Sequence, residues 1–261
     1  MLIRYLGSIV VSFCAYLGEL VLLASDTMRS VFTAPIRWRL VLLQVIEVGF
    51  RSQLVVIVTG GFTGAVFAAQ TYFQFHRLGM DSAVGAVVAA SMFRELGPVL
   101  TGLMVAGRVG AAMSAEIGTM KVTEQIDALR ALGVYPVDYL VVPRTLAMMF
   151  SMPILVAECC AIGIVAGYLV GVGMMDIPGT YYVNYMVKFM GMRDIKMALW
   201  KGFFFAVVIV FVSCHQGLNA KEGAVGVGRA PTEAVVISSL SILVSNFFLS
   251  LILNVVYPLG S

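Results

Sequence analysis

Charged residues are scarce in this sequence, because they make up 12% of its 261 residues, whereas a soluble domain contains about 25%. Hydrophobic residues make up 60%, and the mean hydropathy is +0.96. A bilayer core of about 30 Å requires roughly 20 apolar residues per helix, so the chain has room for five or six spans with short connections. The composition excludes a large soluble domain and predicts an all-α, polytopic integral membrane protein.

Three further signatures are missing. The sequence has no dense run of lysine and arginine of the kind that binds nucleic acids. It also has no GxxxxGK[ST] phosphate loop, the motif that would indicate ATP hydrolysis by this chain. The cysteines have no CxxC spacing and lie in apolar stretches, which is typical of reduced packing residues rather than disulfides or metal ligands: Cys14, Cys159, Cys160 and Cys214. We therefore expect no cofactor, metal site or catalytic group in this chain.

Five stretches meet the length and hydropathy of a transmembrane helix. They cover roughly residues 52–75, 82–107, 145–175, 198–218 and 234–257. Together they predict one membrane domain over residues 1–261, with a transmembrane bundle at 52–257 and an N-terminal region at 1–50.

Residues 5–24 of that N-terminal region are apolar but are interrupted by Glu19. They form either a sixth span or a helix lying in the membrane interface. We favour the interfacial helix, because the residues just after it suit an elbow at the membrane surface: Arg29, Arg37, Trp38 and Arg39. We expect no cleaved signal peptide, since the basic region is Arg4 alone and no small-residue cleavage site follows.

The distribution of lysine and arginine predicts the orientation, because basic residues gather on the cytoplasmic side. With residues 1–50 inside, eleven basic residues are cytoplasmic and five, including Lys188 and Lys201, lie on the opposite side. We therefore expect a multi-pass protein of the cytoplasmic (inner) membrane whose C-terminus, at Ser261, faces the periplasm.

The second span carries Arg94 and Glu95 near its middle, followed by Pro98. Each charge at the centre of a span costs about 2.5–3.5 kcal/mol, and adjacent helical residues point about 100° apart. Pro98 has no N–H for the carbonyl of Arg94, so we expect a kink with that carbonyl hydrated. Either Glu95 lines a polar cavity for substrate head groups, or both charges are structural. Glu158, alone in the third span, has the same two interpretations.

Glycines recur at intervals of four in two spans, at Gly60 and Gly64 and at Gly163, Gly167 and Gly171. Such small residues allow helices to approach closely in a membrane. They form either packing within the chain or a dimer seam. We expect a flexible turn in the last cytoplasmic loop at Gly223, Gly226 and Gly228.

The segment 116–132, EIGTMKVTEQIDALRAL, is the most polar stretch of the chain. Its apolar positions predict an amphipathic helix, stopped by Gly133 with Pro136 beyond: Ile117, Met120, Ile126, Leu129 and Leu132. The helix either packs on its own bundle or offers a charged face to a partner. Because the chain has no ATP-hydrolysing motif, the second interpretation points to a separate ATPase subunit.

These features resemble the MlaE (YrbE) permeases of Mla/Mce-type lipid-trafficking ABC transporters, over residues 53–240. The resemblance is carried by RELGP at 94–98, AGRVG at 106–110, AEIG at 115–118, TEQ at 123–125 and GVGRA at 226–230. It implies a homodimer in which each chain has an interfacial helix and five spans. Two copies of a cytoplasmic ATPase that binds ATP and magnesium, a periplasmic MCE-domain protein and a STAS-domain protein are the implied partners.

The resemblance also implies the substrate and its contacts. Phospholipid would pass between the inner membrane and the MCE-domain carrier, a role in outer-membrane lipid asymmetry. The lipid cavity at the dimer interface would include Glu95 with Arg94, Phe67, Gln74 and Phe75. The helix after AEIG, at 119–132, would couple to the ATPase, with contacts in this region at Glu116, Lys121, Glu124, Gln125, Asp127 and Arg130.

Two other classes of function remain as alternatives. A self-sufficient secondary carrier for an amphipathic solute should show inverted repeats and ion ligands, and the sequence shows neither. The other class is a membrane scaffold or enzyme; an enzyme should show paired catalytic groups, but His76 and His215 are expected on opposite sides of the membrane.

Overall fold

The computed structural model describes residues 2–33, 35–221 and 223–257. These residues form helices and connecting turns, and no strand occurs among them. In chain order the elements are α1 (Leu2–Thr33), α2 (Trp38–Val48), η1 (Phe50–Ser52), α3 (Gln53–His76), η2 (Asp81–Ala83), α4 (Val84–Ser91), η3 (Met92–Leu96), α5 (Gly97–Val105), η4 (Ala106–Gly110), α6 (Ala111–Val122), α7 (Gln125–Ala131), η5 (Val137–Val141), α8 (Val142–Gly173), α9 (Gly179–Phe189), α10 (Met192–Leu218) and α11 (Ala224–Val256).

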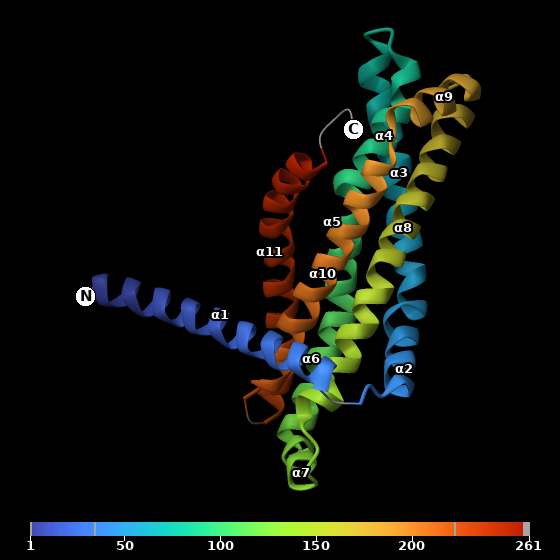
Figure 1. Ribbon diagram of the computed structural model, residues 1–261. Helices are drawn as coiled ribbons and strands as arrows, with labels where there is room; N and C mark the ends of the chain where they lie inside the picture. The colour runs from blue at the N-terminus through green and yellow to red at the C-terminus, as the bar shows by residue number, and fades with distance from the viewer. Residues whose placement is uncertain (1, 34, 222, 258–261) are drawn as a thin grey trace.

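Five helical segments are long and apolar enough to cross a membrane, which confirms the predicted all-α polytopic fold. They are Trp38–His76, Asp81–Val122, Val137–Gly173, Met192–Leu218 and Ala224–Val256. At about 1.5 Å per residue the longest, with 42 residues, reaches roughly 63 Å. Because the hydrocarbon core is only about 30 Å thick, such segments extend beyond the membrane. Figure 1 shows the five segments side by side in one bundle.

Helix α1 lies apart from this bundle. It runs across the long axis of the spans and meets them from its middle to its C-terminal end (Figure 1). The contact is polar: a Glu19 oxygen lies 2.8 Å from Nε2 of His215 on α10, and the hydroxyl of Ser30 donates to Asp138. A helix crossing the bundle axis supports the interfacial interpretation of residues 5–24, and α1 is not among the five candidate spans.

The first span begins earlier than expected. Helix α2 continues through η1 into α3, so this segment starts at Trp38 rather than near residue 52. The outward side chains of α2 are apolar and exposed, as in a lipid-facing helix: Leu42, Leu43 and Ile46. The N-terminal interfacial region is thereby reduced to α1 and the elbow that follows it.

The two ends of the bundle carry the predicted sets of loops. Helix α7 and the turn before α11 lie at one end, whereas α9, the connection between α3 and α4, and the C-terminal end of α11 lie toward the other (Figure 1). Residues 258–261, where the predicted outward C-terminus falls, are outside the described residues. Lys201 corrects the count of basic residues on the two sides of the membrane. It lies inside α10 and is 0% exposed, so it does not belong with the residues outside the spans.

The regularly spaced glycines pack helices within the chain. A Cβ on Gly64 would lie 2.0 Å from the carbonyl oxygen of Gly163, and one on Gly60 would lie 2.7 Å from that of Cys159. A Cβ on Gly171 would lie 2.8 Å from the ring of Tyr182. The structure therefore favours the packing interpretation over the dimer seam for these residues, since α3 lies directly against α8.

The expected turn near residues 223–228 is shorter than predicted. Gly223 has φ +85° and precedes α11, but Gly226 and Gly228 already lie in the first turns of that helix. The helix begins here because Gly226 allows a close approach, in which a Cβ would lie 2.0 Å from the Lys221 carbonyl oxygen.

The second span accommodates its proline without a break. Residues from Val84 to Val122 are helical throughout, with π-helical turns at Met92–Leu96 and Ala106–Gly110. Pro98 lies in the first turn of α5, directly after the first π turn. A π turn widens the helix and changes its hydrogen-bond register, so the helix is locally widened next to the position where a kink is expected.

Candidate functional site

Glu95 lies in a polar cluster between η3, α10 and α11. Its Oε2 is 3.0 Å from the ammonium of Lys201 and accepts a 2.8 Å hydrogen bond from the Asn246 amide. Its Oε1 accepts a 2.8 Å hydrogen bond from the hydroxyl of Ser250. Lys201 is 0% exposed, while the Glu95 side chain is 46% exposed. The carboxylate is therefore both paired and accessible at the protein surface.

Lys201 also resolves the hydrogen-bonding problem that Pro98 creates. Its ammonium donates to the backbone carbonyl of Arg94 at 2.6 Å and to the hydroxyl of Ser250 at 2.8 Å. That carbonyl is the one that would accept an N–H from residue 98 in a regular helix. A buried lysine occupies the position where hydration was expected, so the proline does not by itself indicate a wet pocket.

Arg94 forms a second ion pair. Its Nε donates to Oδ1 of Asp194 at 2.6 Å, and Asp194 is 2% exposed. The other oxygen of Asp194 accepts the Gly191 N–H at 3.1 Å, which caps the start of α10. Both adjacent charges thus reach α10, where Asp194 and Lys201 lie seven residues, about two turns, apart. The pairing supports a structural role for Arg94, and the two ion pairs compensate both adjacent charges of the second span.

A polar row on α11 completes the cluster. Asn246, Ser250 and Asn254 follow one another at intervals of four residues, so they share one side of the helix. The Asn254 oxygen accepts a hydrogen bond from Arg193 at 2.6 Å. Oδ1 of Asn246 is buried and has no hydrogen-bond partner among the described residues. The row thus places this buried acceptor next to the accessible Glu95 carboxylate.

The other predicted cavity residues do not join this cluster. Phe67 lines a separate cavity of about 390 Å³ between α3 and Leu96. Phe75 packs against the hydrophobic core, and Gln74 is exposed near the outer end of α3. Glu158 on α8 is half-buried and forms no ion pair with a described residue. Glu95 instead faces α10 and α11, so the predicted set divides into two groups.

The predicted helix at 116–132 is two helices. Helix α6 ends at Val122 and α7 begins at Gln125, because Glu124 adopts a left-handed conformation with φ 57°. An ion pair of Asp127 with Lys121 at 3.7 Å bridges the turn, and Asp127 also pairs with Arg130 within α7 at 3.2 Å. Most of the expected charged face is therefore paired internally, and Glu124 is the exposed charge at the turn.

The apolar face of this segment also differs from expectation. Ile117 and Ile126 are buried, but Leu132 is 78% exposed and the nearby Tyr135 is 53% exposed. These two side chains follow α7, which forms the end of the bundle in Figure 1. Exposed apolar groups at such a tip indicate an interaction surface.

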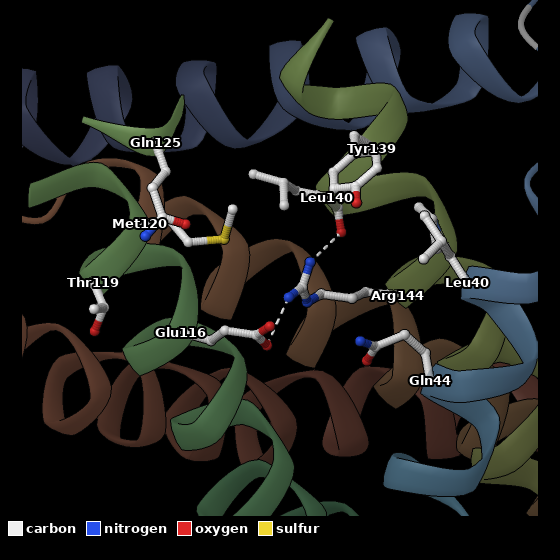
Figure 2. A pocket seen from close by; sticks show the side chains of 10 residues that line it. Leu40, Gln44, Glu116, Thr119, Met120, Gln125, Tyr139, Leu140 and Arg144 are labelled. Atoms are coloured by element: carbon white, nitrogen blue, oxygen red, sulfur yellow. Dashed lines mark hydrogen bonds and ion pairs between the residues drawn. The ribbon is translucent and has the colours of Figure 1, made fainter. Parts of the chain in front are cut away.

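Glu116 and Gln125 line a cavity at the base of this tip rather than its outer surface. Figure 2 shows Glu116 paired with Arg144 of α8, with Nη2 to Oε2 at 2.7 Å, while Gln125 and Met120 lie to one side. The cavity has a volume of about 590 Å³ and is also lined by Leu40 and Gln44 of α2. The predicted coupling residues thus include one ion pair that joins α6 to α8.

The sequence profile of the family described as Permease MlaE matches residues 41–252. The chain belongs to the MlaE permease family. A probable ABC transporter permease protein of Rickettsia felis is 43% identical over 244 residues, which cover 94% of each chain. One from Synechocystis sp. is 43% identical over 203 residues, covering 78% of this chain and 77% of its own.

A plant relative extends this MlaE family comparison. The chloroplastic protein TRIGALACTOSYLDIACYLGLYCEROL 1 of Arabidopsis thaliana is 36% identical over 229 residues, covering 88% of this chain and 65% of its own. The family and the bacterial names identify a transport permease of the ABC class, which implies a partner ATPase and a non-catalytic role for this chain. They disfavour the self-sufficient carrier and the membrane enzyme.

Proposed function

We propose that this MlaE-family permease moves phospholipids between the inner membrane and a periplasmic MCE-domain carrier. The observation that carries the proposal is the accessible Glu95 carboxylate inside a span, bordered by the polar row of α11. Beside this row, α10 and α11 line an apolar cavity of about 770 Å³ with Phe204, Val244 and Phe248. A charged group next to an apolar cavity suits a ligand with a polar head and hydrocarbon tails.

The plant relative is consistent with a lipid substrate, since its name is that of a glycerolipid. A homodimer is supported by the outer surface of α11, of which little is covered within one chain. Its exposed side chains include Leu243, Phe247 and Leu251. In a second copy the same surface would meet its equivalent around the two Glu95 clusters, forming a shared lipid cavity.

ATP and magnesium would bind to the partner ATPase, with two copies under the dimer. The docking element would be α7 and the residues after it, because Leu132 and Tyr135 are exposed beside the charged Glu124. A STAS-domain protein would bind the ATPase, and the MCE-domain protein would meet the end of the bundle that carries α9.

The test is ATP-dependent transfer of labelled phospholipid between liposomes containing the permease with its ATPase and an MCE-domain protein. We expect Glu95→Ala to reduce transfer at least tenfold, a loss of about 1.4 kcal/mol in transition-state stabilisation, while the ATPase stays bound. The matched control is Glu158→Ala, a carboxylate in another span without an ion pair. Equal transfer by the Glu95 variant, at normal protein abundance, would refute the role of Glu95.

A second substitution tests the docking element in the same assay. Leu132→Glu places a charge at the centre of the exposed apolar tip, so the ATPase should dissociate or lose its stimulation by the permease. Val225→Glu is the control, because Val225 is 76% exposed at the start of α11 and outside α7. Full stimulation with Leu132→Glu would show that the ATPase docks elsewhere.

A further inference from the structure

The cavity in Figure 2 is separate from the Glu95 cluster and has a different chemistry. It lies at the cytoplasmic end of the bundle, between α2, α6, the start of α7, η5 and the start of α8. Its volume of about 590 Å³ would hold a small polar group. The lining combines one ion pair with neutral polar side chains and a few apolar ones, so it is neither a lipid-tail cavity nor a purely charged site.

The accessible charge in this cavity is negative. Arg144 is only 5% exposed, and its two terminal nitrogens donate to the Leu140 carbonyl and to Glu116, both at 2.7 Å. The Glu116 side chain is 59% exposed, and its second oxygen accepts no hydrogen bond from the described residues. The guanidinium is therefore covered by protein and both of its terminal nitrogens already donate, while its Nε is buried without a partner among the described residues. The accessible Glu116 carboxylate can accept hydrogen bonds from a cation in the cavity.

Neutral polar groups surround the carboxylate. The amides of Gln44 and Gln125 and the hydroxyl of Tyr139 line the cavity, and they form no side-chain hydrogen bonds within the described part of the chain. A positive charge lies beside them, because the Arg37 guanidinium stacks on the Tyr139 ring at 4.9 Å from its centroid. The cavity thus presents an acceptor for a cation inside and an exposed cation near its edge.

The position of the cavity identifies the source of such a ligand. Arg37 and the neighbouring Trp38 are exposed at the start of α2, and Leu42 and Leu43 on the same helix are exposed and apolar. Basic and tryptophan side chains followed by apolar ones are typical of the cytoplasmic membrane interface. The cavity therefore lies at the level where lipid head groups of the inner leaflet are found.

We propose that this cavity binds the head group of a zwitterionic phospholipid with a primary amine, of the phosphatidylethanolamine type. The ammonium donates hydrogen bonds to Glu116, and the phosphate is held near Arg37, while the tails follow the apolar side of α2. A choline head group has no N–H to donate, so the site discriminates against it. The binding does not require the transport function proposed above.

The test measures lipids retained by the full-length purified chain in detergent, using native mass spectrometry. With equal amounts of phosphatidylethanolamine and phosphatidylcholine added, we expect about tenfold preferential retention of the ethanolamine lipid, the effect of one charge-assisted hydrogen bond. Glu116→Gln should remove this preference. The matched control is Glu47→Gln, because Glu47 is also a cytoplasmic-end carboxylate paired with an arginine but does not line the cavity.

A second variant covers the case in which Glu116→Gln fails to fold. Arg37→Gln changes an exposed side chain and should reduce retention of the ethanolamine lipid about threefold or more. Equal retention of the two lipids by the unaltered chain would overturn the proposal, as would an unchanged preference in Glu116→Gln. Displacement of the lipid by soluble glycerophosphoethanolamine at equal concentration would also overturn it, since the ligand would then be a free metabolite.

Discussion

The pairing of Glu95 with Lys201 predicts a specific pattern of destabilisation. Glu95→Gln leaves the fully buried Lys201 ammonium with only neutral acceptors, and removing one partner of a buried ion pair costs about 3–5 kcal/mol. Because the Glu95 side chain is 46% exposed, we expect the lower end, about 3 kcal/mol. Lys201→Met leaves a carboxylate that keeps two hydrogen bonds, but it also removes the donor to the Arg94 carbonyl, which costs about 1–3 kcal/mol.

The double variant distinguishes this account from independent effects. Combining Glu95→Gln with Lys201→Met removes the unpaired ammonium. The double variant should therefore lose no more unfolding free energy than Lys201→Met alone. The expected coupling is therefore about 3 kcal/mol or more, measured by thermal unfolding of the four proteins in detergent. Effects that add within about 0.5 kcal/mol would refute the conclusion that Glu95 compensates Lys201. Transport measured on the same proteins would then separate stability from substrate passage.

Three further predictions follow from the packing and the sides of the bundle. Gly64→Ala should destabilise the protein by about 1–3 kcal/mol in the same unfolding assay, because the added Cβ would meet the backbone of Gly163. Gly61→Ala is the control and should be nearly neutral, since its Cβ would make an ordinary contact of 3.5 Å. His215→Ala should loosen α1 and increase protease cleavage near Arg37, while His76→Ala at the other end should not; unchanged cleavage would contradict the anchoring role of His215. In a cysteine-free background, a cysteine at Lys188 should be labelled from outside sealed cells and one at Leu132 should not, and the reverse result would invert the orientation.

The spans were predictable because the bilayer imposes a single requirement on composition. A long apolar run can satisfy its backbone hydrogen bonds only as a helix in hydrocarbon, so the five segments follow from hydropathy alone. The partner of each glycine row was not predictable. Spacing by four places Gly60 and Gly64 on one side of α3, but only the folded chain shows that Cys159 and Gly163 meet them.

The sequence predicts only part of the cluster around Glu95. Arg94 and Glu95 stand out as charges within a span. Lys201 lies within the predicted span at 198–218 but is counted with the basic residues outside it, because the count assumes that basic residues avoid the membrane. The row of Asn246, Ser250 and Asn254 was a usable signal, since polar residues spaced by four in an apolar helix indicate a buried polar face. The break at Glu124 had no such signal, because a non-glycine residue with positive φ is rare.

The connection between the tip and the charge cluster follows from the continuity of the second span. Glu95 and Val122 belong to one uninterrupted helical segment, so about 27 residues, or roughly 40 Å, separate them without a loop. A displacement of the C-terminal end of α6 therefore reaches Glu95 unless the helix itself absorbs it, whereas a displacement of α7 must first pass through the turn at Glu124. The π turn at Ala106–Gly110 is the place within this stretch where the hydrogen-bond register already departs from the α-helix. Arg108 in that turn donates to the Ser52 hydroxyl at 2.7 Å, which ties the turn to the first span. Any movement passed from an ATPase to the Glu95 cluster must thus either shift this contact or carry the first span with it.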